Sequence, residues 1–187
     1  TMMRQMVKDL VAPIDPGMLI PLNDGAALRA GGHTYTAHVT PGHASGHLAL
    51  AQGRTLLSGD HLLANITPNP FIEADPHSPS GRRKSLLEYL ASFDRFAELD
   101  PEIVLPGHGP AFADLPLLVQ NLRSHHDNRA GLILELITSA PDLTIYELAE
   151  RFFSGLASYH VVLGVSEIAA HVDLLEARGQ VLATGQP

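Results

Sequence analysis

Three short segments of the sequence each place a glycine, and then a polar side chain, at the end of a predicted strand. They are Thr40–His47 (TPGHASGH), Ser58–His61 (SGDH) and Leu105–Pro110 (LPGHGP). Proline and glycine break a strand sharply, so each segment presents an imidazole or a carboxylate where the strand ends. Glycine next to such a group removes side-chain bulk beside a bound ion. A pattern repeated at three strand ends is hard to explain by packing alone and favours a metal site.

The composition supports a metal site with nitrogen and oxygen donors. The chain has 187 residues, of which 11 are histidine and none is cysteine. Histidine and aspartate suit zinc, iron or manganese. The absence of cysteine excludes disulfides, thiolate ligands and a cysteine nucleophile. The formal net charge of −8 argues against a nucleic-acid partner, which needs a basic surface. No apolar run is long enough to cross a membrane and no signal-peptide pattern is present, so we expect a cytoplasmic protein without a membrane partner.

The first two thirds of the chain predict hairpins followed by a strand and helices. Gly31-Gly32 and Gly53 mark two hairpins, and His33–Val39 is typical of a strand. Residues 64–81 are proline-rich and predict a long loop. Ser80 is the expected N-cap of a helix over 81–99, with one apolar face formed by Leu86, Leu90, Phe93 and Ala97. A short strand over 103–105 and a long helix from about 115 to 139 follow.

The last 56 residues predict a separate helical module. Thr144 and Glu147 form a capping-box pattern, and Ser166 is a second expected N-cap. Arg178-Gly179 should end that helix, and Val181–Ala183 is typical of a terminal strand. Three helices and a hairpin indicate a winged-helix-like module over 132–187, after a first domain over 1–131. The module is acidic, so we expect a lid or packing element and not a DNA reader.

The three glycine-containing segments resemble the third, fourth and fifth metal-binding motifs of the metallo-β-lactamase superfamily, and the resemblance covers about residues 20–130. It implies an α/β fold, the second half of an αββα sandwich followed by the helical module. By this resemblance His43 would bind the first metal, Asp60 would bridge both metals and His108 would bind the second. His47 would support the ligands, and His61 would lie beside them or line the pocket. His77, in the long loop, could touch substrate.

One family motif does not occur. The His-x-His-x-Asp-His signature, which supplies further ligands to both metals, is found nowhere in these 187 residues. In the family it precedes the segment that corresponds to Thr40–His47. We therefore expect a piece of a longer protein that lacks the first half of the sandwich. Alone it should bind metal weakly and have little activity, and it should associate with the missing half or with a second copy.

For the complete protein, the resemblance implies a metal-dependent hydrolase. Two metal ions, zinc first with iron or manganese as alternatives, would share a hydroxide that attacks a small acyl substrate, namely an ester, a thioester or a lactone. Asp60 would be the catalytic residue that holds both ions, and no other cofactor is expected. Two alternatives stay open: a metal-dependent ribonuclease of the same fold, and a non-catalytic binding or regulatory protein.

Overall fold

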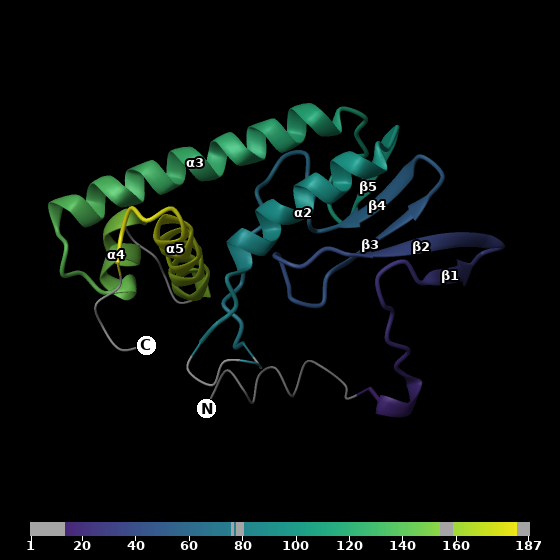
Figure 1. Cartoon of the computed structure of the whole chain (residues 1–187), viewed down its shortest axis with the longest axis horizontal. Coiled ribbons are helices and arrows are strands. Elements are labelled where there is room, and N and C mark those ends of the chain that lie inside the picture. The colour runs from purple at the N-terminus through teal and green to yellow at the C-terminus, as the bar shows by residue number, and fades with distance from the viewer. Residues whose placement is uncertain (1–13, 76, 78–80, 154–158, 183–187) are drawn as a thin grey trace.

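The chain folds into an α/β structure with one five-stranded sheet and helices beside it (Figure 1). A computed structural model describes residues 14–75, 77, 81–153 and 159–182. The strands are β1 (Ala27–Ala30), β2 (His33–Val39), β3 (Leu48–Gln52), β4 (Thr55–Gly59) and β5 (Ile103–Pro106). The helical segments are the 3-10 turn η1 (Pro16–Met18), α2 (Ser85–Leu99), α3 (Leu115–Ser139), α4 (Ile145–Phe152) and α5 (Tyr159–Ala177).

The strands follow one another in the sheet in the order of the chain. Strands β1 to β4 are antiparallel neighbours, whereas β4 and β5 are parallel, with α2 in the connection between them. Both predicted hairpins are confirmed: Gly31 and Gly32 have φ of +56° and +79°, as a tight turn between twisted strands requires. This topology brings the carboxyl ends of β2, β4 and β5 to the same edge of the sheet, where the three glycine-containing segments begin.

Helix α2 packs its apolar face into the core, but that face differs from the predicted one. Leu86 and Phe93 are buried as expected, together with Tyr89 and Phe96, whereas Ala97 is exposed. The helix begins at Ser85 after Lys84, and the predicted cap Ser80 lies outside the described residues. Leu90 is partly buried and packs against the core, so Ala97 is the one residue of the predicted face that lies outside it.

The long helix α3 begins and ends where the sequence predicts. Asp114 accepts a hydrogen bond from the Leu117 N–H at 3.0 Å, which satisfies one of the free donors of the first turn. The predicted capping box is also present at α4, where Thr144 and Glu147 exchange hydrogen bonds. The predicted division at 131/132 falls inside α3 and stays a prediction.

The C-terminal region is helical, and part of its predicted organisation is wrong. Ser166 does not cap a helix, because α5 begins at Tyr159 and continues past it. Its hydroxyl instead accepts a hydrogen bond from the Ile72 N–H at 2.9 Å. Gly179, with φ +70°, follows the end of α5 as expected. Residues 181 and 182 belong to no strand, and the predicted last strand residue, Ala183, lies outside the described residues.

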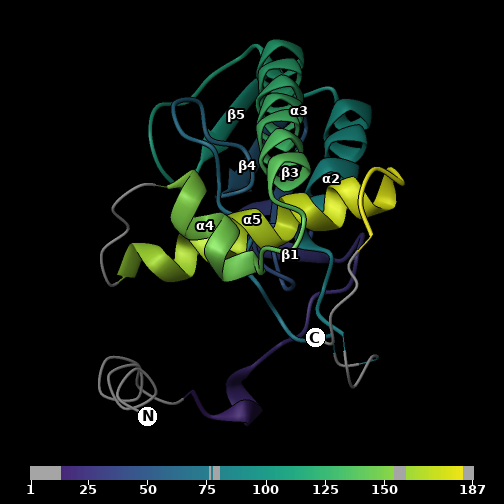
Figure 2. The ribbon, with the colours of Figure 1, turned by 90° about the vertical axis from the view of Figure 1, so that its left-hand side faces the viewer.

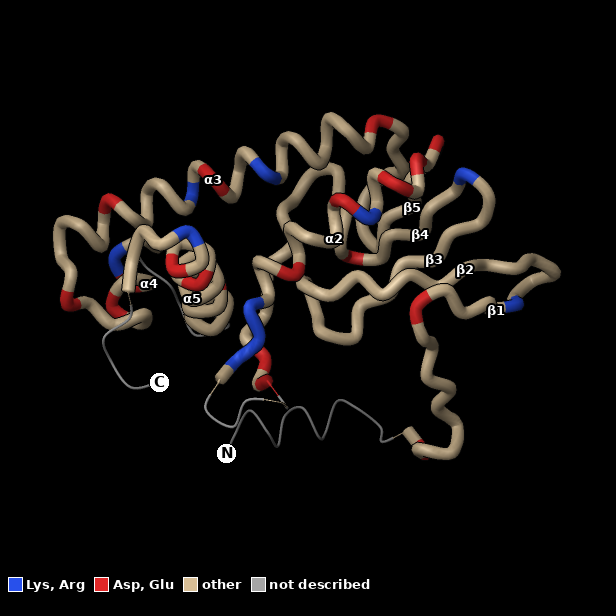
Figure 3. Tube along the Cα trace, in the orientation of Figure 1, with Lys and Arg blue, Asp and Glu red and all other residues tan. Residues whose placement is uncertain are grey.

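Helix α5 joins the C-terminal region to the rest of the chain. It crosses α3 at a steep angle (Figures 1 and 2) and packs against α2, α3 and α4. One hydrophobic cluster extends from Val104 in the sheet to Ile168 in α5. At its side, Asp173 of α5 is buried and accepts hydrogen bonds from Arg82 and Lys84, at 2.7 and 2.6 Å, in the basic segment before α2 (Figure 3). The helical region and the sheet therefore share apolar and ionic contacts.

Among the described residues, no helix combines the length and the apolar character that a membrane span requires.

Three histidines are completely buried: His61, His126 and His171. Burial lowers the pKa of His61 and of His126 to about 3 and that of His171 to about 4. In the unfolded chain these histidines bind protons near pH 6.5, whereas in the folded chain they stay neutral until the pH falls to their lowered pKa values. Between these limits protonation favours unfolding. We expect the free energy of unfolding to fall from pH 6.5 to pH 4, by up to about 1.4 kcal/mol per pH unit for each histidine.

Urea denaturation at pH 7 and pH 5, with a chelator present, measures this effect. The variant His33→Gln removes an exposed histidine of β2 and should keep the same pH dependence. Equal stability at the two pH values would contradict the expectation.

Candidate metal centre

Glycine lets the three segments approach one another at the edge of the sheet. Gly59 lies at the end of β4 with φ +52°, and a Cβ there would lie 2.7 Å from His47 Nε2. A Cβ on Gly107 would lie 2.4 Å from Asp60 Oδ1. A Cβ on Gly42 would lie 2.4 Å from the Cα of Tyr89 in α2. Each glycine therefore leaves space that a polar side chain or a neighbouring backbone fills.

Asp60 and His108 meet directly. The parallel pairing continues past the strands, since the Gly107 N–H donates to the Gly59 carbonyl at 2.8 Å. Asp60 follows Gly59 and His108 follows Gly107, so the two side chains come next to each other. His108 Nδ1 lies 2.6 Å from Asp60 Oδ1. The His108 side chain is 72% exposed and the Asp60 side chain 33%, so both groups are open to an ion or a ligand.

The ring of His43 is held with one nitrogen free. Its Nδ1 donates to the backbone carbonyl of Asn69 at 3.1 Å, which leaves Nε2 with a lone pair. This arrangement is typical of metal-binding histidines, whose second nitrogen is fixed by a carbonyl or carboxylate. The side-chain amide of Asn69 donates in turn to the Leu163 carbonyl of α5 at 3.1 Å. The long loop therefore connects His43 to the C-terminal helices.

His47 lies among the other candidate ligands. Its Nδ1 is 2.8 Å from the Thr40 hydroxyl, and its ring centroid is 6.4 Å from that of His43. Burial, and next the neighbouring His43, lower the pKa of His47, while Asp60 acts in the opposite direction. The His47 ring is therefore neutral at physiological pH and lies close to the predicted ligands His43 and Asp60.

His61 points into the core beneath this edge. Its ring stacks on Tyr89 with centroids 4.4 Å apart, and its Nε2 donates to the Tyr89 carbonyl at 3.3 Å. The Tyr89 hydroxyl donates to the His61 carbonyl at 3.0 Å. His61 thus fixes the backbone directly after Asp60 against α2. The sequence did not indicate Tyr89, because a tyrosine on a helix face is typical of an ordinary core.

His77 lies apart from the other candidates. It is exposed, and its backbone N–H donates to Asp75 at 2.8 Å. No hydrogen bond or ring contact of the described residues joins it to His43, Asp60 or His108. Its predicted contact with substrate stays a prediction.

The donors present fit part of a divalent metal centre. His43 offers a free Nε2, and Asp60 and His108 offer an oxygen and a nitrogen at the space beside Gly107. Histidine and aspartate are among the ligands that zinc takes in catalytic sites. Among the described residues Asp60 and His108 contact each other directly, and the assignment of these three residues as ligands stays a prediction.

Comparison with known proteins agrees with this geometry. A family model described as the metallo-β-lactamase superfamily matches residues 3–108. The chain therefore belongs to the metallo-β-lactamase superfamily.

Two curated proteins show how far the similarity extends in sequence. The probable metallo-hydrolase YqjP of Bacillus subtilis is 34% identical over 139 residues, which cover 73% of this chain and 43% of YqjP. The lactamase-like protein vrtG of Penicillium aethiopicum is 30% identical over 125 residues, which cover 66% of this chain and 36% of vrtG.

Two solved structures show the same similarity in three dimensions. The metallo-beta-lactamase family protein TTHA1429 of Thermus thermophilus has a TM-score of 0.75 and 31% identity, covering 94% of this chain and 54% of its own. A beta-lactamase domain protein of Burkholderia ambifaria has a TM-score of 0.77 and 27% identity, and the match covers 93% of this chain and 51% of the Burkholderia protein. The chain thus spans about half the length of these structures and less than half of the two curated relatives.

We expect Gly107→Ala to weaken metal binding at the strand-edge centre about 10- to 100-fold, because the new methyl group would displace the Asp60 carboxylate. Zinc titration by isothermal calorimetry measures the change. Gly46→Ala, in the loop between His43 and His47, is the matched control. No atom of the described residues lies within 4 Å of the place its methyl group would take, so it should bind zinc as the wild type does. Equal affinity in Gly107→Ala would show that Asp60 is not a ligand.

Proposed function

We propose that this chain carries part of the active site of a metal-dependent hydrolase that cleaves small acyl substrates, namely esters, thioesters or lactones. The observation that carries the proposal is the meeting of Asp60 and His108 at the ends of parallel strands β4 and β5, in a chain of this superfamily. YqjP, which is named a probable metallo-hydrolase, supports hydrolysis as the reaction class.

The chain's own residues would bind and orient a divalent metal. Zinc in such a site acts as a Lewis acid and lowers the pKa of water to near 7, which supplies a nucleophile at neutral pH. The Asp60 carboxylate would contribute negative charge close to the ion. Gly107, which has no side chain, would leave room for the carboxylate and the ion. The Asn69 carbonyl would keep the His43 ring in the tautomer whose Nε2 can bind metal.

The apolar side chains of the loop that contains Asn69 support the proposal of an acyl substrate. The Phe71 ring lies 5.3 Å from the His43 ring, centroid to centroid. Two more large apolar side chains of the same loop, Ile66 and Ile72, are 61% and 45% exposed. This loop would provide contacts to a hydrocarbon part of the substrate. Met18, near the start of the described chain, is also exposed. Exposed apolar side chains such as these are consistent with association with another chain or segment.

Asp60→Asn in the natural full-length protein should lower hydrolysis of acyl esters and thioesters at least about 100-fold and release the zinc bound at the strand edge, because the amide cannot offset the charge of the ion. Activity is followed with a panel of p-nitrophenyl esters, acyl thioesters and lactones, and zinc by elemental analysis. Asp94→Asn, at an exposed position of α2, is the matched control and should leave both unchanged.

Cleavage of a single-stranded RNA, with no acyl substrate turned over, would replace this proposal by the ribonuclease alternative. Full activity and full zinc content in Asp60→Asn would remove Asp60 from the site.

A further inference from the structure

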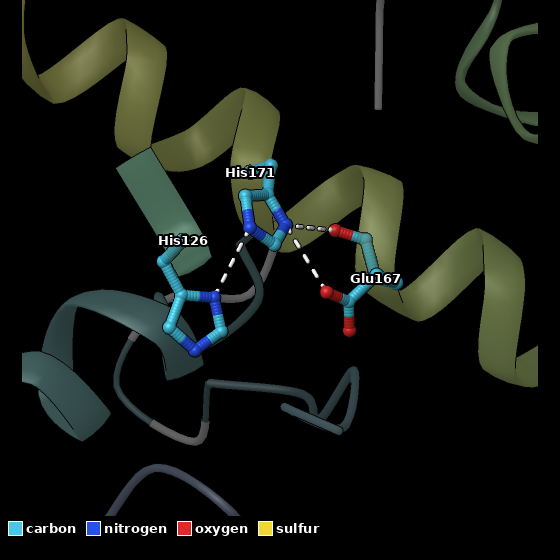
Figure 4. Close-up of side chains that lie close together, drawn as sticks. All are labelled: His126, Glu167 and His171. Carbon is cyan, nitrogen blue, oxygen red and sulfur yellow. Dashed lines mark hydrogen bonds and ion pairs between the residues drawn. The ribbon is translucent and has the colours of Figure 1, made fainter. Parts of the chain in front are cut away.

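A second group of candidate ligands is buried between α3 and α5, on different elements from the strand-edge centre. His126 of α3 and His171 of α5 are completely buried, and Glu167 of α5 is 4% exposed. Figure 4 shows the three side chains close together. Glu167 and His171 are four residues apart, so they share one face of their helix. Donor atoms of all three side chains lie within 4.8 Å of one another. The sequence places His126 on the apolar face of α3 but gives no sign of its partners on α5.

The hydrogen bonds leave two ring nitrogens facing each other. His171 Nδ1 donates to the backbone carbonyl of Glu167 at 2.8 Å. Its Nε2 therefore carries a lone pair, and this atom lies 3.2 Å from His126 Nδ1 (Figure 4). The other nitrogen of His126, Nε2, is buried and has no hydrogen-bond partner among the described residues. The His126 ring thus makes one hydrogen bond among the described residues, the one with His171.

The spacing of these nitrogens suits a shared ion. Two nitrogen ligands at about 2.0–2.1 Å from a tetrahedral zinc lie about 3.3 Å apart, close to the 3.2 Å between His126 Nδ1 and His171 Nε2. One oxygen of Glu167 is held by Arg129 Nη1 at 2.5 Å and lies 3.6 Å from His171 Nδ1. A carboxylate has lone pairs for both a guanidinium and a metal. The Glu167 carboxylate lies on the Nδ1 side of the His171 ring and within 4.8 Å of the other donor atoms, so its side chain would have to turn to contact an ion held by the two rings.

The surroundings favour a structural role. The site joins the middle of α3 to the middle of α5, and Tyr89 of α2 packs on His126 with ring centroids 5.6 Å apart. Its three side chains have little or no exposed surface, so substrate has no access to it.

We propose that His126, Glu167 and His171 bind a divalent ion of the zinc class that fastens α5 to α3, in a site separate from the strand-edge centre. Two imidazoles and one carboxylate are a donor set that zinc accepts. Water would complete the coordination. Because the ligands come from two helices that meet only in the folded chain, ion binding and the packing of α5 would be coupled.

The test uses the 187-residue chain, stripped of metal and then titrated with Zn²⁺ or Co²⁺. At zinc concentrations about 100-fold above the dissociation constant, the melting temperature should rise by about 5–10 °C. Co²⁺ should give the ligand-field absorption of a tetrahedral nitrogen and oxygen site. His171→Gln and Glu167→Gln should each weaken the binding at least about 10-fold and remove most of the thermal shift.

His43→Gln, at the strand-edge centre, is the matched control and should keep both the thermal shift and the Co²⁺ spectrum. Two results would overturn the proposal. Loss of the shift in His43→Gln, with retention in His171→Gln, would place the ion at the strand edge. No shift and no Co²⁺ spectrum in the wild type would mean that the two histidines form only a hydrogen-bonded pair. Should His171→Gln fail to fold, Glu167→Gln decides, because its amide oxygen can still accept from Arg129.

Discussion

The parallel pairing of β4 with β5 is the contact on which the strand-edge site depends. It continues beyond the strands through the hydrogen bond from the Gly107 N–H to the Gly59 carbonyl. This bond sets Asp60 and His108 side by side, and the missing side chain at position 107 leaves the space that the Asp60 carboxylate occupies. The antiparallel pairs from β2 to β4 then bring the segment with His43 to the same edge. The positions of three polar residues, far apart in sequence, thus follow from backbone pairing.

Local patterns of the sequence predicted most of the elements. The hairpins at Gly31-Gly32 and Gly53, the long helix α3 and the capping box at Thr144 all depend on neighbours within a few residues, and all are present. The family also follows from such patterns, because its motifs are short and contiguous. The α/β fold then follows from the family.

Contacts between distant segments were beyond the reach of the sequence. Serine is a residue type that often caps helices, but the Ser166 hydroxyl accepts a hydrogen bond from the backbone N–H of Ile72, in another part of the chain. The stack of Tyr89 on His61 and the approach of His171 to His126 depend on how helices pack against the sheet and against one another. A histidine on an apolar face looks the same whether it fills space or has a polar partner across a helix interface.

Asn69 fixes the length of the loop that it belongs to. Its carbonyl holds His43 and its side-chain amide holds the Leu163 carbonyl of α5, so one residue is bound on two sides by separate parts of the fold. A deleted residue between Leu63 and Asn69 would pull Asn69 away from one contact or the other. This stretch of irregular chain is therefore under the same constraint as a strand in a sheet, where a slip of one residue changes every partner. Variation in the loop among proteins with the same site should be in its residue types and not in its length.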